Sequence, residues 1–361
     1  MRSSLIKEVS QKGLNTYLKE RQHEAMYWAA FFPIKNVISL SYTTLIGETG
    51  GRVAADVISY DASAPLKTRK VIGKLAGDIP KIAIKRKMTE TDFQDYLYLS
   101  RIADADQKQL LDLIYDDIDF VTQGVFARME WLTLQALSRT AITLSAANNN
   151  GIVTEESIDF KMPDTNKFGA TVAWNAADKA TTKPITDIKA IVKAARKVGH
   201  RLTHMLMDQD RIDDFMLSTE VQTYLKSYFK LEGSDVLPFE NIALINKALA
   251  SAKLPIIVGI DQSIDIEGKD GNKIAVNPWD NRFVTFVSSL KMGNMLNGPI
   301  VEEIVKPKDV IQAKAGNILV SKYSTTDPVA EFTKGEASAF PSWPTVDKAY
   351  SLKATATTWA L

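Results

Sequence analysis

The chain has 361 residues, of which 45% are hydrophobic and 24% are charged, a composition typical of soluble proteins with roughly two or three domains. Its formal net charge of +1 argues against nucleic-acid binding through bulk charge. The absence of cysteine excludes disulfides, thiolate catalysis and most structural zinc sites, and no apolar run is long enough to span a membrane.

The first predicted segment is a polar arm, residues 1–35, that ends in an aromatic cluster. Tyr27, Trp28 and Phe31 belong to this cluster. Two interpretations are equally open: the cluster docks on another surface, or the arm forms a helix on the chain's own core. Residues 36–61 then alternate in strand fashion around a glycine-rich loop from Gly47 to Gly51.

Residues 62–88 form a basic segment with Asp78 as its one acid. Residues 71–72 and 82–84 are predicted to pair as the two strands of a hairpin. Such a hairpin has little core of its own, so we expect it to project and lie on a partner surface; the alternative is a solvated basic face. The basic residues are Lys67, Arg69, Lys70, Lys74, Lys81, Lys85, Arg86 and Lys87.

A long helix is predicted from Asp106 to Arg139, with Asp106 as its N-cap and the run from Asn148 to Gly151 as its stop. At about 1.5 Å per residue it would be about 50 Å long, which favours a spine carrying two domains over a core helix or a coiled-coil arm. Gly124 is a point where it could bend. The apolar stripe consists of Leu110, Ile114, Ile118, Val121, Val125, Met129, Leu132 and Ala136.

The approach to this helix and its first half are acidic. Before the long helix, the spacing of Thr91 and Gln94 predicts a capping box that starts a separate short helix, which ends near Arg101. Opposite charge then predicts that the basic segment and the acidic half meet, either within one subunit or between subunits. The acidic residues are Asp104, Asp106, Asp112, Asp116, Asp117 and Asp119, against Lys108.

Residues 184–299 alternate between helical and strand patterns, which predicts an α/β domain. Helices are expected from a cap at Thr186 to Gly199, from Asp208 or Asp210 through Phe229, and over residues 240–252. Strands are expected over residues 200–207, 254–260 and 282–289, with a hairpin over 264–276. Strand-like segments return from residue 300 onward.

The sequence predicts no catalytic residue, no cofactor-binding residue and no metal ligand. His200 and His204 have the spacing of a zinc-protease motif, but Arg201 replaces the required glutamate and the segment is predicted to be a strand. The glycine-rich loop matches neither a dinucleotide fingerprint nor a P-loop. We therefore expect no cofactor.

Four stretches in a fixed order resemble the major capsid protein E family of tailed bacteriophages, the lambda-like branch of the HK97 fold. The resemblance covers most of the chain past residue 30. It rests on Ala64-Pro65 with the basic run and residues 79–84, on residues 128–131 with Ala136-Leu137, on residues 186–224, and on residues 327–341.

This resemblance implies an α+β, HK97-like capsid fold with an arm, an extended loop, a spine-helix peripheral domain and an α/β axial domain. The implied divisions are residues 1–35 (N-terminal arm), 36–61 (peripheral strands), 62–90 (extended loop), 91–183 (spine helix and peripheral domain), 184–299 (axial domain) and 300–361 (C-terminal return).

The resemblance also implies a non-enzymatic protein that assembles in the host cytoplasm into hexamers and pentamers of an icosahedral virion head. Its expected partners are copies of itself, a separate scaffolding protein, a portal, a decoration protein in some relatives, and double-stranded DNA bound without sequence recognition, with no membrane. The alternatives are an encapsulin-type shell around cargo protein and, more distantly, an α+β enzyme.

Charge segregation suggests which residues join subunits. We expect residues 62–88 of one subunit to lie along the acidic half of a neighbour's spine. Each exposed pair contributes about 0–1 kcal/mol, so charge would set register while apolar burial supplies adhesion. The candidates are Lys67, Arg69, Lys70, Lys85 and Arg86 with Asp112, Asp116 and Asp117.

Overall fold

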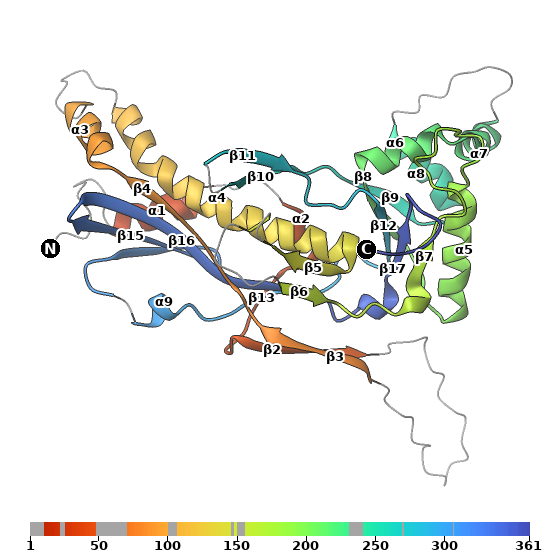
Figure 1. Ribbon diagram of the computed structural model, residues 1–361, viewed down its shortest axis with the longest axis horizontal. Helices are drawn as coiled ribbons and strands as arrows, with labels where there is room; N and C mark the ends of the chain where they lie inside the picture. Colours follow the sequence, from red (N-terminus) through yellow and green to blue (C-terminus); the bar gives the residue numbers. More distant parts are fainter. Residues whose placement is uncertain are drawn as a thin grey trace, which may run out of the picture. The chain divides into compact units, whose positions relative to one another are not determined.

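The computed structural model describes residues 11–21, 26–47, 71–99, 107–145, 148–149, 156–230, 241–268, 271–305 and 307–361 (Figure 1). The chain divides into two compact units. Unit 1 comprises Met1–Tyr42, Gly77–Glu130 and Asn294–Ser342, and unit 2 comprises Thr43–Ala76, Trp131–Gly293 and Trp343–Leu361.

Helices occur in both units. They are α1 (Gln11–Glu20), α2 (Tyr27–Phe31), α3 (Glu90–Leu99), α4 (Gln107–Arg139), α5 (Pro184–Lys197), α6 (Gln209–Leu217), α7 (Thr219–Phe229), α8 (Ile242–Ser251) and α9 (Val301–Val305), with 3₁₀ turns η1 (Asp164–Asn166) and η2 (Val346–Lys348). No helix in the described part of the chain has the length and apolarity needed to cross a bilayer.

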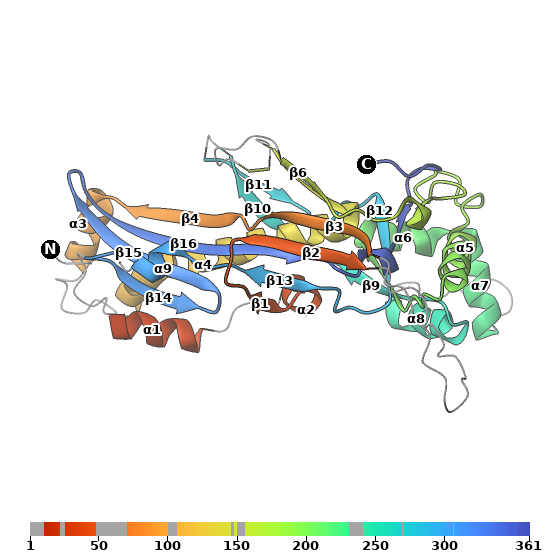
Figure 2. The same cartoon turned by 90° about the horizontal axis from the view of Figure 1, so that it is seen from below.

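Unit 1 is built on a six-stranded sheet in the order β1-β13-β16-β15-β14, with β4 paired to β16. The long strand β16 organises it, because its length lets it pair with β15, β4 and β13 in antiparallel register. Helix α4 lies across one face (Figures 1 and 2). The strands are β1 (Ile34–Asn36), β4 (Lys81–Met88), β13 (Asn294–Asn297), β14 (Ile311–Ala315), β15 (Ile318–Thr326) and β16 (Val329–Ser342).

The predicted long helix is confirmed as α4, which runs unbroken through Gly124 for 33 residues. Its apolar stripe packs inward, with Val121, Val125 and Met129 fully buried. The predicted stop at the asparagine run is wrong. Thr140 adopts a left-handed backbone with φ 57° and ends the helix, and the residues that follow pair as a strand. Asp106 lies outside the described residues.

The predicted basic hairpin is also wrong. Strand β3 (Val71–Asp78) pairs with β2 (Ser41–Gly47), whereas β4 pairs with β16 along its whole length. Joining the large sheet buries Ile82 and Met88, which an isolated hairpin would leave in water. The capping box at the start of α3 is displaced as well: Thr89, not Thr91, forms it, and the Thr89 N–H donates to Asp92 Oδ2 at 2.7 Å.

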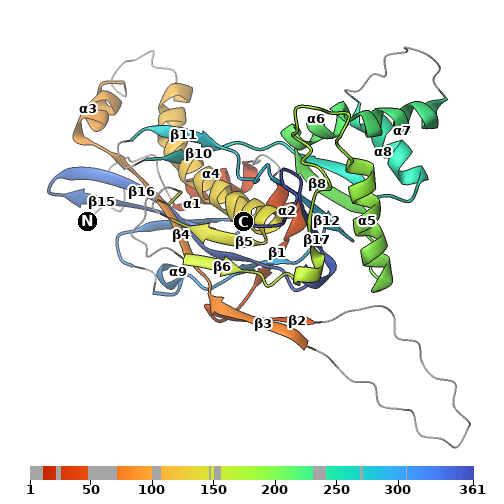
Figure 3. The ribbon, with the colours of Figure 1, turned by 45° about the vertical axis from the view of Figure 1, so that its right-hand side comes forward.

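Unit 2 contains a five-stranded sheet in the order β7-β17-β12-β8-β9. Helices α5 to α8 gather around it (Figure 3), and their buried faces share one core with the sheet through Ile188, Phe215, Leu249, Met205 and Phe286. The strands are β7 (Lys167–Gly169), β8 (His204–Asp208), β9 (Ile256–Ile260), β12 (Phe283–Val287) and β17 (Tyr350–Lys353).

Two further strand pairs belong to unit 2. They are β5 (Ala141–Leu144) with β6 (Glu156–Asp159), and β10 (Ile264–Glu267) with β11 (Lys273–Val276). The predicted alternation of helices and strands is confirmed through β12. The cap at Thr186 is wrong, because Pro184 occupies the first helical turn, where its missing N–H costs nothing. Asp208 is confirmed as the cap of α6 and accepts from the Arg211 N–H at 3.3 Å.

Candidate functional site

The arm packs on the chain's own core, which decides between its two interpretations. Trp28 is buried and stacks on Phe126 with ring centroids 5.7 Å apart. The Glu130 carboxylate accepts from the backbone N–H of Tyr27 at 3.0 Å and of Trp28 at 2.7 Å. Burial raises the pKa of Glu130, although these two hydrogen bonds oppose the increase. Glu130 therefore caps α2 from a different helix.

The charge pairing predicted between subunits occurs inside one chain. Arg86 Nη1 lies 2.6 Å from Asp116 Oδ2, and Arg86 Nε lies 3.2 Å from Asp117 Oδ1. This corrects the expectation for these three residues: pairing of β4 with β16 brings the basic strand beside α4. Lys85 lies over the Phe332 ring at 4.8 Å. Lys67, Arg69 and Lys70, and the side chain of Asp112, lie outside the described residues.

The two aspartates that contact Arg86 differ in environment. The Asp116 side chain is 66% exposed, so its ion pair is a weak surface pair. The Asp117 side chain is 12% exposed, and burial raises its pKa, whereas the positive charges of Arg86 and Lys322 lower it. Asp117 thus depends on Arg86 for compensation of a buried charge.

A buried ion pair lies close to Asp117 and was not singled out from the sequence. Lys322 Nζ on β15 lies 3.0 Å from Glu331 Oε1 on β16, and both side chains are 1% exposed. The available signal was a lysine inside the apolar run that begins at Ile318. Removing one partner would leave the other charge buried and unpaired, which costs far more than an exposed pair.

A second set of charges holds the short helix α9 against the sheet. Glu302 forms ion pairs with Lys334 and Lys81, and Glu303 lies 2.5 Å from Lys314 Nζ. Burial would raise the pKa of Glu302, but hydrogen bonds and charge from Lys334 and Lys81 outweigh it and lower the pKa. Both carboxylates of α9 are therefore directed to its own unit.

The apolar side chains of α9 are left facing solvent. Val301 is 64% exposed, Ile304 70% and Val305 68%. Three neighbouring apolar side chains on one short helix, held by ion pairs at its other residues, are typical of a protein interaction surface. This helix could not be predicted from the sequence, because five residues are too few to show a helical period.

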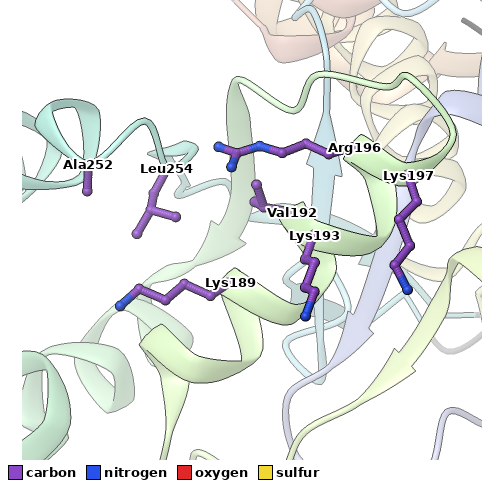
Figure 4. Close-up of a pocket in the computed structure, with 7 residues that line it drawn as sticks. All are labelled: Lys189, Val192, Lys193, Arg196, Lys197, Ala252 and Leu254. Atoms are coloured by element: carbon purple, nitrogen blue, oxygen red, sulfur yellow. The ribbon is translucent and has the colours of Figure 1, made fainter.

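Unit 2 has a basic surface on α5. Lys189, Lys193, Arg196 and Lys197 line an open hollow of about 570 Å³ together with Val192, Ala252 and Leu254 (Figure 4). The one acid of this helix, Asp187, is buried and accepts from the Thr171 N–H at 3.0 Å and from Trp174 Nε1 at 2.9 Å. It does not offset the charge of the exposed face.

The two histidines flagged by their spacing have structural partners. His200 Nδ1 is 3.1 Å from the Tyr350 hydroxyl, and His204 Nδ1 is 2.8 Å from Thr203 Oγ1. Within the described ranges, no group of three or more histidine, aspartate or glutamate side chains is arranged to hold a metal ion.

Asp208 gives unit 2 a pH dependence. Burial raises its pKa to about 6, although the Arg211 N–H opposes this. Because the folded chain holds this proton more tightly than the unfolded chain, the free energy of unfolding should fall as pH rises from about 4 to about 6.

The variant Asp208→Asn keeps a capping oxygen but cannot ionise. Its free energy of unfolding should therefore fall by about 1–3 kcal/mol less over this pH range than that of the unmodified chain. Thermal unfolding across this pH range checks it, with exposed Asp213→Asn as control; equal pH profiles for Asp208→Asn and the unmodified chain would contradict it.

Comparison with known protein families gives a match that includes residues of both units. The family model of phage major capsid protein E matches residues 19–239. No curated protein sequence matches the chain.

Two solved structures share the fold. One, assigned as the capsid protein of an E. coli CFT073 prophage, has 16% identity and a TM-score of 0.56, covering 96% of this chain and 99% of the other. The second, a phage-related protein of Bordetella bronchiseptica RB50, has 13% identity and a TM-score of 0.52, covering 95% and 96%.

Proposed function

This chain belongs to the phage major capsid protein E family, and from that premise we propose that it forms hexamers and pentamers of an icosahedral head around double-stranded DNA. The family and fold are those of structural capsid proteins, not enzymes. The protein is a virion component and associates with copies of itself. The expected HK97-like α+β fold is confirmed. The encapsulin alternative has less support, because the matching family model is that of a phage capsid protein.

The observation that supports a specific contact is the exposed apolar side of α9. We propose that a second copy of the chain covers Val301, Ile304 and Val305 in the assembled shell. Burying each side chain fully is worth about 1.5–3 kcal/mol, and a shell repeats the contact in every subunit. The ion pairs of Glu302 and Glu303 orient the helix so that these side chains face outward.

Changing Val301, Ile304 and Val305 together to serine should strongly impair assembly while leaving the fold intact, because all three are exposed in the single chain. Size-exclusion chromatography with light scattering measures the assembled fraction. The matched control is Ile274→Ser, at a side chain 62% exposed on β11. The contact is refuted if the triple variant assembles at the same protein concentration as the unmodified chain.

The remaining parts of the function are proposals that follow from family membership. We propose that a separate scaffolding protein, a portal and a decoration protein act with this chain, and that assembly takes place in the host cytoplasm. We also propose the division into arm, extended loop (residues 62–90), peripheral domain and axial domain. Within that loop, Lys67, Arg69 and Lys70 stay predicted contacts with a neighbouring subunit.

A further inference from the structure

The exposed face of α5 carries positive charge that its own helix does not neutralise. Lys189, Lys193, Arg196 and Lys197 are all exposed, whereas Asp187 is buried. Their spacing places them on successive turns of one face, extending about 12 Å at 1.5 Å per residue. The net charge of the whole chain is +1, so this face is a local concentration of charge.

No acidic side chain is among the described residues that line the hollow beside α5. Val192 and Leu254 contribute apolar surface to it, and Figure 4 shows Lys193 and Lys197 extending in the same direction from neighbouring turns. Arg196 Nη2 donates to the backbone carbonyl of Lys253 at 3.4 Å, which holds the guanidinium beside the hollow. No ion pair involves these four side chains in the described part of the chain. The surface is therefore suited to an anion from outside the chain.

The chemistry of the four side chains is compatible with phosphate. The three lysines bind phosphate as flexible point charges, and the fork of Arg196 also matches phosphate geometry. A row of such charges fits a regular polyanion, because duplex DNA carries one charge per about 1.7 Å of its axis. Where the structure describes the chain, the residues lining the hollow offer no side-chain amide, carboxylate or aromatic group that would distinguish bases.

We propose that the α5 face binds the phosphate backbone of duplex DNA without reading its sequence. This inference rests on the proposal that the shell encloses DNA, and it adds the surface that the DNA contacts. A DNA contact at this face is compatible with the net charge of +1, because four clustered cations attract phosphate locally even when the whole chain is nearly neutral.

The test compares two full-length variants of equal net charge. In the first, Lys189, Lys193, Arg196 and Lys197 are changed to glutamine. In the matched control, four scattered exposed lysines are changed to glutamine: Lys35, Lys230, Lys291 and Lys308. Fluorescence anisotropy measures binding of the unassembled chain to a labelled duplex of random sequence over a range of salt concentrations, with a second duplex sequence and polyglutamate as competitors.

The unmodified chain should show a slope of log affinity against log salt of about −3 to −4, from about 0.9 per phosphate contact. The clustered variant should lose most of this slope and on the order of 100-fold in affinity at low salt, whereas the control should bind like the unmodified chain. Changing Lys193 and Lys197 alone should remove about half of the slope, which tests the same surface with fewer substitutions.

The proposal is overturned by any of four results: no duplex binding by the unmodified chain, undiminished binding by the clustered variant, an equal loss in the control, or displacement by polyglutamate as effective as by duplex. The last result would indicate an acidic polypeptide as the partner. Shell formation, followed separately by electron microscopy, should persist in the clustered variant, so failure of the DNA contact and failure of the capsid function give different results.

Discussion

Replacing Gly335 with alanine should destabilise the chain by roughly 2–3 kcal/mol, because overpacking a close crossing forces backbone shifts. A Cβ at Gly335 would lie 2.7 Å from the Val121 carbonyl oxygen and 3.0 Å from Val121 Cβ. The carbonyl belongs to the backbone of α4 and cannot rotate away. The strand β16 and the helix must therefore separate, and chemical denaturation of the unassembled chain measures the cost.

Gly124→Ala is the matched control at the same crossing. Its Cβ would meet Ile84 Cδ1 at 2.8 Å, and this atom is the end of a side chain that can change rotamer. Alanine also improves helix propensity by about 1 kcal/mol, so the net change should stay within about 1 kcal/mol of zero. If the two variants unfold at the same denaturant concentration, the close approach at Gly335 does not limit packing.

Glu130→Ala should cost about 2–4 kcal/mol and release α2 from the core. The substitution removes the acceptor of the part-buried Tyr27 N–H and of the buried Trp28 N–H, and an unmade buried hydrogen bond costs its full desolvation penalty. Hydrogen exchange at the α2 amides should accelerate more than exchange in unit 2, and denaturation gives the total loss.

The comparison variant at this position is Glu130→Gln. Glutamine keeps an acceptor oxygen and removes the buried charge whose pKa is raised by burial. We expect it to lose less than half of what alanine loses. Equal protection of the α2 amides in the unmodified and alanine variants would show that Glu130 does not hold the arm.

The elements that could be predicted from the sequence are those whose signal is local. The stripe that includes Val121, Val125 and Met129 predicted α4, and short periodic segments with turn residues predicted the alternation in unit 2. The partner of β4 could not be predicted in this way. Pairing with β16 depends on apolar burial more than 240 residues away in sequence, at Gly335↔Ile84 and its neighbours.

Of the charged and apolar groups described above, the sequence predicted the ion pairs of Arg86 but not the α9 surface or the α5 face. Opposite charge correctly brought Arg86 to Asp116 and Asp117, but charge cannot tell a contact within one chain from a contact between chains. The caps show a related limit, since Thr89 and Thr91 are both suitable capping residues and helix geometry selects one. The α9 surface and the α5 face emerge when side-chain exposure is known.

Electron microscopy of the purified protein, expressed alone and with a scaffolding protein, shows whether the chain builds an icosahedral shell. We expect closed shells of uniform diameter whose averaged images have icosahedral symmetry and resolve hexamers and pentamers, with α9 covered by a neighbouring subunit. A chain that stays monomeric at all concentrations with and without scaffold, or that forms particles without closed symmetry, would contradict it.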